Sequence, residues 1–175
     1  MILAPGRLPG VVRIDVEPLV DDRGFFARTW CARELAAAGI DPRIAQCNIS
    51  YNRVRGTLRG LHYQAEPHAE AKFVRCTAGA IFDVIVDLRP GPTYLHWESF
   101  TLSAANRSTL YVPRGCAHGF QTLEDATEVF YQMSEFYAPE AARGIAWDDP
   151  VLGIEWPIDG PVMSAKDRSY AHLTP

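Results

Sequence analysis

The stretch AKFVRCTAGAIFDVIVDL, residues 71–88, indicates the fold class of this chain. Residues 71–77 and 81–88 are short apolar segments of the kind that form β-strands, and Ala78-Gly79 between them is typical of a turn. In the second segment, alternate positions fall on two faces, one with Phe82, Val84 and Val86 and the other with Asp83, Ile85 and Asp87. We therefore predict a β-hairpin that turns at Ala78-Gly79.

The same pattern continues on both sides of this stretch, where Gly, Pro and Asn separate short apolar segments. Further strands are predicted at residues 11–16, 97–102, 109–112, 119–122 and 127–135. Only residues 32–38 read clearly as a helix, and Gly39 is placed to end it. Many short strands with turns between them predict an all-β sandwich or jelly-roll barrel with a few short helices. Such a barrel can enclose a small-molecule cavity.

Length and composition are those of an ordinary globular protein. The chain has 175 residues, enough for one domain with a proper core, and no repeat or linker divides residues 1–175. Hydrophobic residues make up 47% and charged residues 22%. The net charge of -4 argues against binding to nucleic acid or to a membrane surface. A few local Arg and Lys residues are still sufficient to bind an anionic small molecule.

Targeting and cysteine signals point to the same cellular compartment. Nothing near Met1 resembles a signal peptide, and no apolar run approaches the ~18–20 residues of a membrane helix, so we expect a cytoplasmic protein. The cysteines are scattered without a Cys-x-x-Cys pair: Cys31, Cys47, Cys76 and Cys116. This spacing predicts free buried thiols rather than disulfides or zinc.

A metal site is not predicted. Tyr63-Gln64 follow His62, so the His-x-His pair of metal-binding jelly rolls is missing, and His118 alone would make a poor site. His68 and His96 lie in segments that we expect to form loops.

Residues 59–72 concentrate groups that suit a phosphorylated sugar. The stretch RGLHYQ at 59–64 and Lys72 supply two cations, an imidazole and an amide. Groups of these types also suit proton transfer at a carbon beside a ketone, which needs a base to remove the α-proton and an acid to return a proton. It also needs a cation or donor at the enolate oxygen. His62 is the best base, because imidazole titrates close to working pH. Taken singly, a His, Lys or Tyr in a strand is more often structural than catalytic.

Several motifs occur in an order that resembles one family. They are DRGFF at 22–26, QCNIS at 46–50, RGLHYQ at 59–64, PRGCAHGF at 113–120, YAPE at 137–140, WDDP at 147–150, IEWP at 154–157 and SAKD at 164–167. Together they resemble the dTDP-4-dehydrorhamnose 3,5-epimerase family over about residues 13–169. The resemblance implies a cupin-type jelly roll and an isomerase that needs no cofactor and acts on a nucleoside-diphosphate sugar. It also implies a homodimer in which an N-terminal strand, residues 11–16 here, reaches the partner.

The resemblance further implies roles for individual residues. His62 would remove the proton, with Asp167 orienting its ring and Asp83 as a competing candidate for that task. Lys72 would stabilise the enolate, and Tyr131 would protonate the opposite face. Contacts with the diphosphate, the sugar or the nucleotide base are implied for Arg23, Gln46, Asn48, Arg59, His118, Lys166 and, stacked on the base, Tyr137.

Some positions depart from residues that are usual in this family. They are Arg28 and Ala142, where acidic residues are common, Cys47 in place of Asp, and Gln132 in place of Lys. His62, Lys72 and Tyr131 are kept, which favours the same chemistry on an altered substrate. The alternatives are a 3,4-ketoisomerase of the same fold, a non-catalytic sugar-nucleotide-binding cupin and, last, a metal-dependent oxygenase. The nucleotide base, and inversion at C3, C5 or both, are left open.

Overall fold

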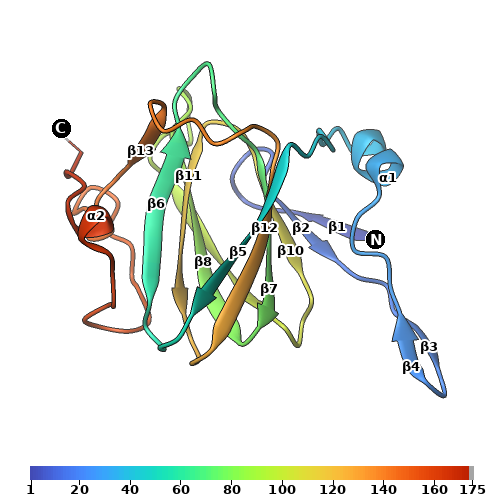
Figure 1. Cartoon of the computed structure of the whole chain (residues 1–175). Coiled ribbons are helices and arrows are strands. Elements are labelled where there is room, and N and C mark those ends of the chain that lie inside the picture. Colours follow the sequence, from blue (N-terminus) through green and yellow to red (C-terminus); the bar gives the residue numbers. More distant parts are fainter. Residues whose placement is uncertain (174–175) are drawn as a thin grey trace.

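Strands far apart in the sequence pair into two antiparallel sheets that face each other (Figure 1). The computed structural model describes residues 1–173. The six-stranded sheet runs in the order β1 (Ile2–Pro5), β2 (Val12–Asp15), β10 (Thr109–Val112), β7 (Lys72–Ala78), β12 (Thr127–Met133) and β5 (Gln46–Asn52). The five-stranded sheet runs in the order β13 (Ala142–Gly144), β6 (Leu58–Gln64), β11 (Cys116–Thr122), β8 (Ala80–Asp87) and β9 (Trp97–Ser103). This architecture confirms the predicted all-β jelly roll.

The predicted hairpin at Ala78-Gly79 is wrong in its pairing, although both strands exist. β7 pairs with β10 and β12, whereas β8 pairs with β9 and β11, so the turn carries the chain from one sheet to the other. Gly79 makes this crossing with φ 72°, and a Cβ there would lie 2.4 Å from the Thr127 hydroxyl oxygen. Side-chain alternation identifies a strand but does not identify its neighbour, which is why the pairing was mispredicted.

Both faces of β8 are buried, which explains why apolar residues occupy both of its faces. Ile81 and Ile85 join the core cluster between the sheets. Val84 and Val86 join a second cluster on the outer side, where Ile145 and other residues of the C-terminal segment cover the sheet. Each fully buried side chain of this size contributes about 1.5–3 kcal/mol, so the C-terminal segment is held firmly against β6 and β8.

The helices are short. α1 (Ala32–Ala37) ends as predicted, because Gly39 has φ 75° and donates to the Ala36 carbonyl at 3.0 Å, while Ile40 donates to the Leu35 carbonyl at 3.0 Å. α2 (Ala165–Arg168) begins at Ser164, whose hydroxyl accepts a hydrogen bond from the Asp167 backbone. In the described part of the chain, no helix is long and apolar enough to cross a membrane.

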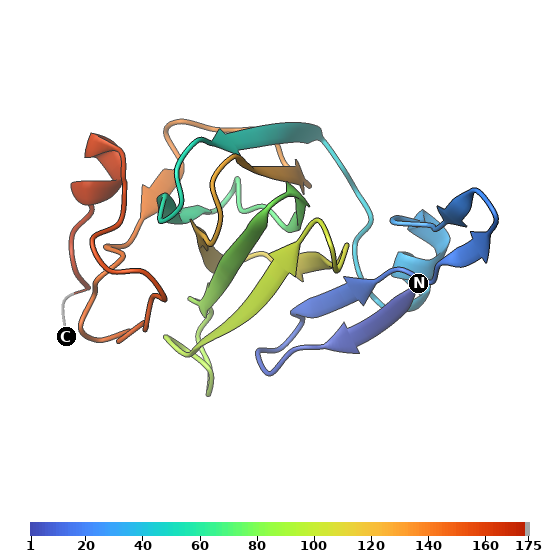
Figure 2. The ribbon, with the colours of Figure 1, turned by 90° about the horizontal axis from the view of Figure 1, so that it is seen from below.

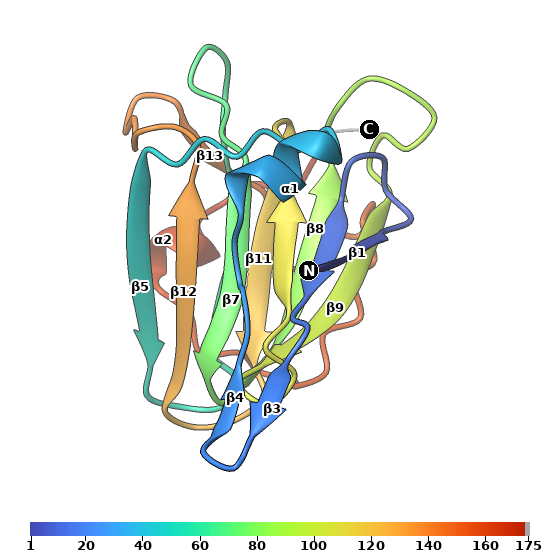
Figure 3. The ribbon, with the colours of Figure 1, turned by 90° about the vertical axis from the view of Figure 1, so that its right-hand side faces the viewer.

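A small hairpin, β3 (Leu19–Asp21) and β4 (Gly24–Phe26), stands apart from the barrel (Figures 1 and 3). Its side chains Leu19, Val20, Phe25 and Phe26 are exposed, and the Arg107 guanidinium lies 4.6 Å from the centre of the Phe25 ring. From below, the N-terminal strands and the C-terminal segment occupy opposite sides of the barrel (Figure 2). β2, which corresponds to the predicted strand at 11–16, lies within its own sheet between β1 and β10.

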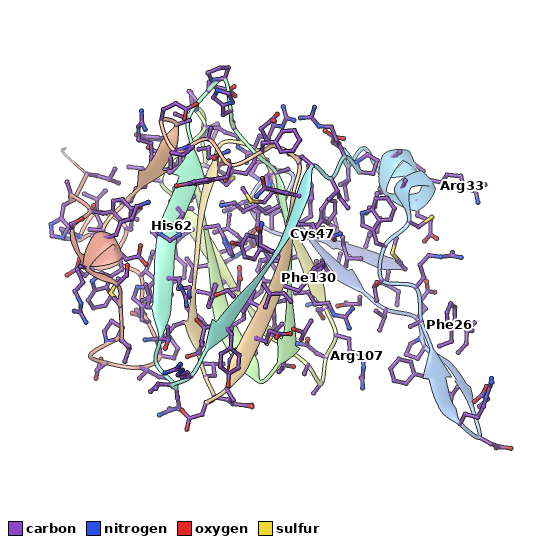
Figure 4. All side chains as sticks on the ribbon, in the orientation of Figure 1. Phe26, Arg33, Cys47, His62, Arg107 and Phe130 are labelled. Atoms are coloured by element: carbon purple, nitrogen blue, oxygen red, sulfur yellow. The ribbon has the colours of Figure 1, made fainter. Side chains whose placement is uncertain are left out.

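All four cysteines are free, as predicted, but only two are buried. Cys76 and Cys116 belong to the core cluster, where burial raises the pKa of their thiols to about 11 and about 12. These thiols are unreactive because almost none is ionised at neutral pH. Cys47 is exposed and Cys31 is half-buried, so the prediction of buried thiols is wrong for them. Cys47 lies on β5, where alternate side chains point away from the barrel (Figure 4).

Candidate active site

A cavity of about 450 Å³ opens between the two sheets beside β5 and β6. Its walls come from β5, β6, β7, β11, β12 and β13, together with Tyr137 and the C-terminal residues Lys166 and Tyr170. A volume of this size fits one small organic ligand. Because several strands from both sheets contribute, a ligand in the cavity contacts the two sheets on its two sides.

An irregular step in β6 brings Arg59 and His62 to the same wall. His118 pairs with His62 and Phe120 with Arg59, so β11 advances two residues while β6 advances three. The extra residue is a β-bulge, and without it Arg59 and His62 would point to opposite faces. Gly60 permits the step with φ 139°, since a Cβ there would lie 2.5 Å from the Gly119 Cα. The glycine in RGLHYQ is therefore the sequence signal for this geometry.

His62 is bound to Asp167, the first of the two candidate partners. Its Nε2 lies 2.8 Å from Asp167 Oδ1, and the side chain projects from β6 on the side of α2 (Figure 4). Burial acts to raise the pKa of the Asp167 carboxyl, but hydrogen bonding and charge from His62, with help from Ser164 and Gly60, bring it below its usual value. An ionised carboxylate can only accept a hydrogen bond, so Nε2 carries the proton that it donates to Asp167. In the neutral ring the lone pair is then on Nδ1.

Asp83, the competing candidate, binds the other cavity histidine. Asp83 Oδ2 lies 2.8 Å from His118 Nε2 on the neighbouring strand. Burial raises the pKa of the Asp83 carboxyl, and the positive charges of His118 and Lys72 oppose this only in part. His118 also lines the cavity, directly across from His62 in the pairing of β6 and β11. The site thus holds two separate histidine–carboxylate pairs.

Lys72 places a fixed cation in the cavity wall. Its side chain is almost fully buried, and Nζ lies 3.0 Å from Glu70 Oε1. Nζ also donates to the His62 carbonyl oxygen at 3.2 Å. An ammonium group has three N–H donors, so these contacts engage two of them.

Tyr131 faces the same cavity from the six-stranded sheet, which also carries Lys72 and lies opposite the sheet of His62. On β12 it pairs with Val74 of β7, and the next position but one, Met133, pairs with Lys72. Positions two apart share a face of a strand, so Tyr131 and Lys72 point into the cavity together. Burial raises the pKa of Tyr131, and the positive charge of Arg59 opposes this in part, so the phenol stays protonated at neutral pH. His62 and Tyr131 therefore stand on facing walls.

The predicted binding residues divide into two groups. Arg59, His118, Tyr137 and Lys166 line the cavity. Gln46, Asn48 and Arg23 do not belong to its lining. Gln46 accepts a hydrogen bond from the Tyr137 backbone at 2.9 Å, and Asn48 contacts the Met133 sulfur at 3.6 Å, so both support residues that line it.

Arg23 lies at the turn of the β3–β4 hairpin, where it forms an ion pair with Asp21. Among the positions that depart from the family pattern, Ala142 lines the cavity. Arg28 instead forms an ion pair with Glu34 at 2.8 Å, and Gln132 Nε2 lies 3.8 Å from the exposed Cys47 thiol. Ala142 is thus the departure with a direct route to a bound ligand.

Sequence reasoning assigned no role to several residues of the wall, notably Glu70, Arg143 and Tyr170. The Tyr170 ring meets the His62 ring edge-on, with centroids 5.8 Å apart and an interplanar angle of 71°. It also covers Gly144, where a Cβ would lie 2.3 Å from ring carbons. No motif contains Tyr170 or Glu70, so only the fold reveals that they reach the cavity.

Comparisons with known proteins agree over the full length of the barrel. The family described as dTDP-4-dehydrorhamnose 3,5-epimerase matches residues 5–174. The dTDP-4-dehydrorhamnose 3,5-epimerase of Shigella flexneri is 41% identical over 163 residues, which is 92% of this chain and 90% of that protein. Two crystal structures of such enzymes are also similar to this chain in fold.

The Bacillus anthracis enzyme, with TDP and PPi bound, has a TM-score of 0.95 and 39% identity, over 98% of this chain and 99% of its own. The Legionella pneumophila enzyme, in complex with dTDP-4-keto-L-rhamnose, has a TM-score of 0.91 and 34% identity, over 98% and 92%.

Proposed function

Because this chain belongs to the dTDP-4-dehydrorhamnose 3,5-epimerase family, we propose that it inverts C3, C5 or both in a dTDP-4-keto-6-deoxyhexose. The observation that carries the proposal is the single cavity lined by His62, Lys72 and Tyr131. The nucleotides bound to the Bacillus anthracis and Legionella pneumophila enzymes support a thymidine diphosphate in the same role here.

His62 acts as the base in this proposal. With Nε2 hydrogen-bonded to Asp167, Nδ1 is the atom that takes the proton from the carbon next to the carbonyl. The Asp167 carboxylate then stabilises the imidazolium that forms and keeps the ring in one orientation. A positioned base of this kind accelerates proton transfer by about 10²- to 10⁴-fold.

Lys72 stabilises the enolate. Removal of an α-proton moves negative charge to the C4 oxygen of the sugar, and a nearby ammonium lowers the energy of that charge. Glu70 and the His62 carbonyl engage two of the three N–H groups of Lys72, which leaves the third for the C4 oxygen. Because these two contacts hold the ammonium, little reorganisation is needed when the charge develops.

Tyr131 returns a proton to the opposite face. A sugar ring held between the two sheets has His62 on one side and Tyr131 on the other, which is the arrangement that inversion requires. The raised pKa of Tyr131 favours the protonated form that an acid needs. Arg59 and Lys166 supply positive charge for the diphosphate, and Tyr137 supplies an aromatic face for the thymine.

We propose further that the protein works as a homodimer. The β3–β4 hairpin exposes Leu19, Val20 and Phe26 and carries Arg23 away from the cavity of its own chain, which supports a second copy as its binding partner. In that dimer Arg23 contributes to the diphosphate site of the partner.

Proton exchange provides the direct test. The protein is incubated with dTDP-4-keto-6-deoxyglucose in deuterated water, and C3 and C5 are followed by NMR. We expect deuterium at one or both carbons with the wild type, and loss of exchange with His62→Asn. Migration of the carbonyl from C4 to C3 would instead indicate a ketoisomerase. Tight binding of several nucleotide sugars without exchange at either carbon would indicate a binding protein.

A further inference from the structure

The Glu70 carboxylate is a charged group in the cavity wall, and only one of its two oxygen atoms has a partner among residues 1–173. The residue is 6% exposed and lies two positions before Lys72, at the start of β7. One oxygen, Oε1, forms the 3.0 Å ion pair with Lys72 Nζ. The other oxygen, Oε2, is buried and has no hydrogen-bond partner among residues 1–173.

A buried carboxylate oxygen without a hydrogen bond is costly, because it has lost water and gained nothing in return. An ionised carboxylate can only accept hydrogen bonds, so the missing partner must be a donor. Glu70 lines the cavity, so a molecule that fills the cavity is able to bring that donor.

The charge of Glu70 restricts which part of the ligand approaches it. A carboxylate repels a diphosphate, while a hydroxyl group is an ordinary donor to it. Glu70 is also joined through Lys72 to the His62 carbonyl, which places it next to the reacting carbons rather than at the nucleotide end. A 4-keto-6-deoxyhexose joined to a nucleotide at C1 has ring hydroxyls at C2 and C3 only.

We propose that Glu70 Oε2 accepts a hydrogen bond from the C2 or C3 hydroxyl of the bound hexose, and that Glu70 thereby determines specificity for a hydroxylated sugar. This inference rests on the proposed epimerase function and adds a contact to the same site. The contact also fixes the rotation of the ring relative to His62 and Tyr131, so it selects which hydrogen faces the base.

A protein–ligand cycle tests the contact. Wild type, Glu70→Ala and Glu70→Gln are each assayed for deuterium incorporation at C5 with the parent sugar and with its 2-deoxy and 3-deoxy analogues. For the wild type we expect kcat/KM to fall on the order of 10- to 100-fold with one analogue, the value of a hydrogen bond to a charged group. Glu70→Ala should show no such penalty for that analogue, because its acceptor is already gone.

The comparison within each variant separates this role from simple support of Lys72. If Glu70 only held Lys72, Glu70→Ala would lose the same factor with all three sugars, and the inference would be overturned. Glu70→Gln keeps the shape and a neutral acceptor. Its fall in kcat/KM with that analogue should therefore lie between the values for the wild type and for Glu70→Ala. A Gln variant as selective as the wild type would also overturn the inference, even if Glu70→Ala failed to fold.

Glu124→Ala, an exposed carboxylate in the loop between β11 and β12, is the matched control and should behave as wild type. Failure of the proposed function looks different from failure of this inference. If the proposed function is wrong, the wild type will exchange no proton of the parent sugar. If the wild type exchanged protons of the parent sugar but showed the same fall in kcat/KM with the deoxy analogues as Glu70→Ala, only the inference about Glu70 would be overturned.

Discussion

His62 and His118 lie directly opposite each other on β6 and β11, yet each Nε2 is hydrogen-bonded to a different carboxylate, Asp167 and Asp83. The pKa values of the two carboxyl groups are shifted in opposite directions. The pKa of Asp83 is raised by burial, whereas that of Asp167 is lowered because His62 and its other hydrogen bonds outweigh burial. Of the two pairs, His62–Asp167 is therefore the one with an ionised carboxylate secured against protonation, which suits it to support a base.

Replacement of Asp167 by Asn should lower kcat for proton exchange on the order of 100-fold, with little change in KM. The amide keeps the shape but no longer stabilises the imidazolium or dictates which nitrogen carries the proton. Exchange at C3 and C5 by NMR measures the effect. Asp148→Asn removes the exposed Asp148–His172 pair, 3.2 Å apart, and is the matched control, expected to leave exchange unchanged. A large rise in KM with unchanged kcat would contradict the assignment.

The lowered pKa of Asp167 also predicts how stability depends on pH. A carboxyl with a folded pKa below its unfolded value, about 3.9, stabilises the protein above that value and loses this contribution as pH falls through the folded pKa. Wild type should therefore exceed Asp167→Asn in free energy of unfolding at pH 7, and the gap should narrow below about pH 4. Urea unfolding at pH 7, 5, 4 and 3 measures both curves. A gap that stayed constant to pH 3 would mean that ionised Asp167 does not stabilise the fold.

Tyr131→Phe should separate the two halves of the reaction. Without the phenol, the epimerised product should form on the order of 100-fold more slowly, while His62 continues to remove and return protons on its own face. NMR then records deuterium without inversion. In the wild type the raised pKa predicts that Tyr131 does not ionise until above its ordinary value of 10.0, so activity should not decline below that pH through this group. Equal loss of exchange and inversion would argue against a role as acid alone.

Mixed dimers test the proposed place of Arg23. If Arg23 serves the partner's cavity, neither Arg23→Ala nor His62→Asn homodimers have a complete site. A mixed dimer has one complete site, because the His62→Asn chain supplies Arg23 and the Arg23→Ala chain supplies His62. Activity should therefore reappear when the two variants are unfolded together and refolded. Mixing each variant with itself is the control, and absence of recovery in the mixture would place Arg23 outside the partner's site.

Strand positions were predictable because local alternation carries the signal. β9, β10 and β12 end within two residues of the predicted bounds, and Gly39 marked the end of α1. Pairing was not predictable, as the crossing at Gly79 shows, since the choice of neighbour depends on contacts distant in the sequence. β5 was missed because its less exposed alternate positions, Gln46, Asn48 and Ser50, are polar, so its inner face lacks the apolar residues that usually indicate a strand.

The site was predictable where motifs carry chemistry and not where the fold alone brings residues together. His62, Lys72, Tyr131 and Lys166 all reach one cavity. Tyr170 lies outside the motifs and arrives with the C-terminal segment, which packs on β13 through contacts that no short pattern records. Arg23 shows the reverse case, because a recognisable motif lies on a hairpin that leaves the barrel.

The contact between Tyr170 and Gly144 supplies the last prediction. Gly144 has no unusual backbone angle to preserve, but a Cβ there would lie 2.3 Å from the Tyr170 ring, so Gly144→Ala must displace that ring. Because the ring meets His62 edge-on, we expect proton exchange to fall on the order of 10-fold. Tyr170→Ala removes the clash, so the double variant should exchange no more slowly than Tyr170→Ala alone. Rates for the four proteins, with thermal unfolding to confirm folding, complete the cycle. If the rate of the double variant were instead lowered by the product of the two single-variant factors, Gly144→Ala would act by some route other than Tyr170.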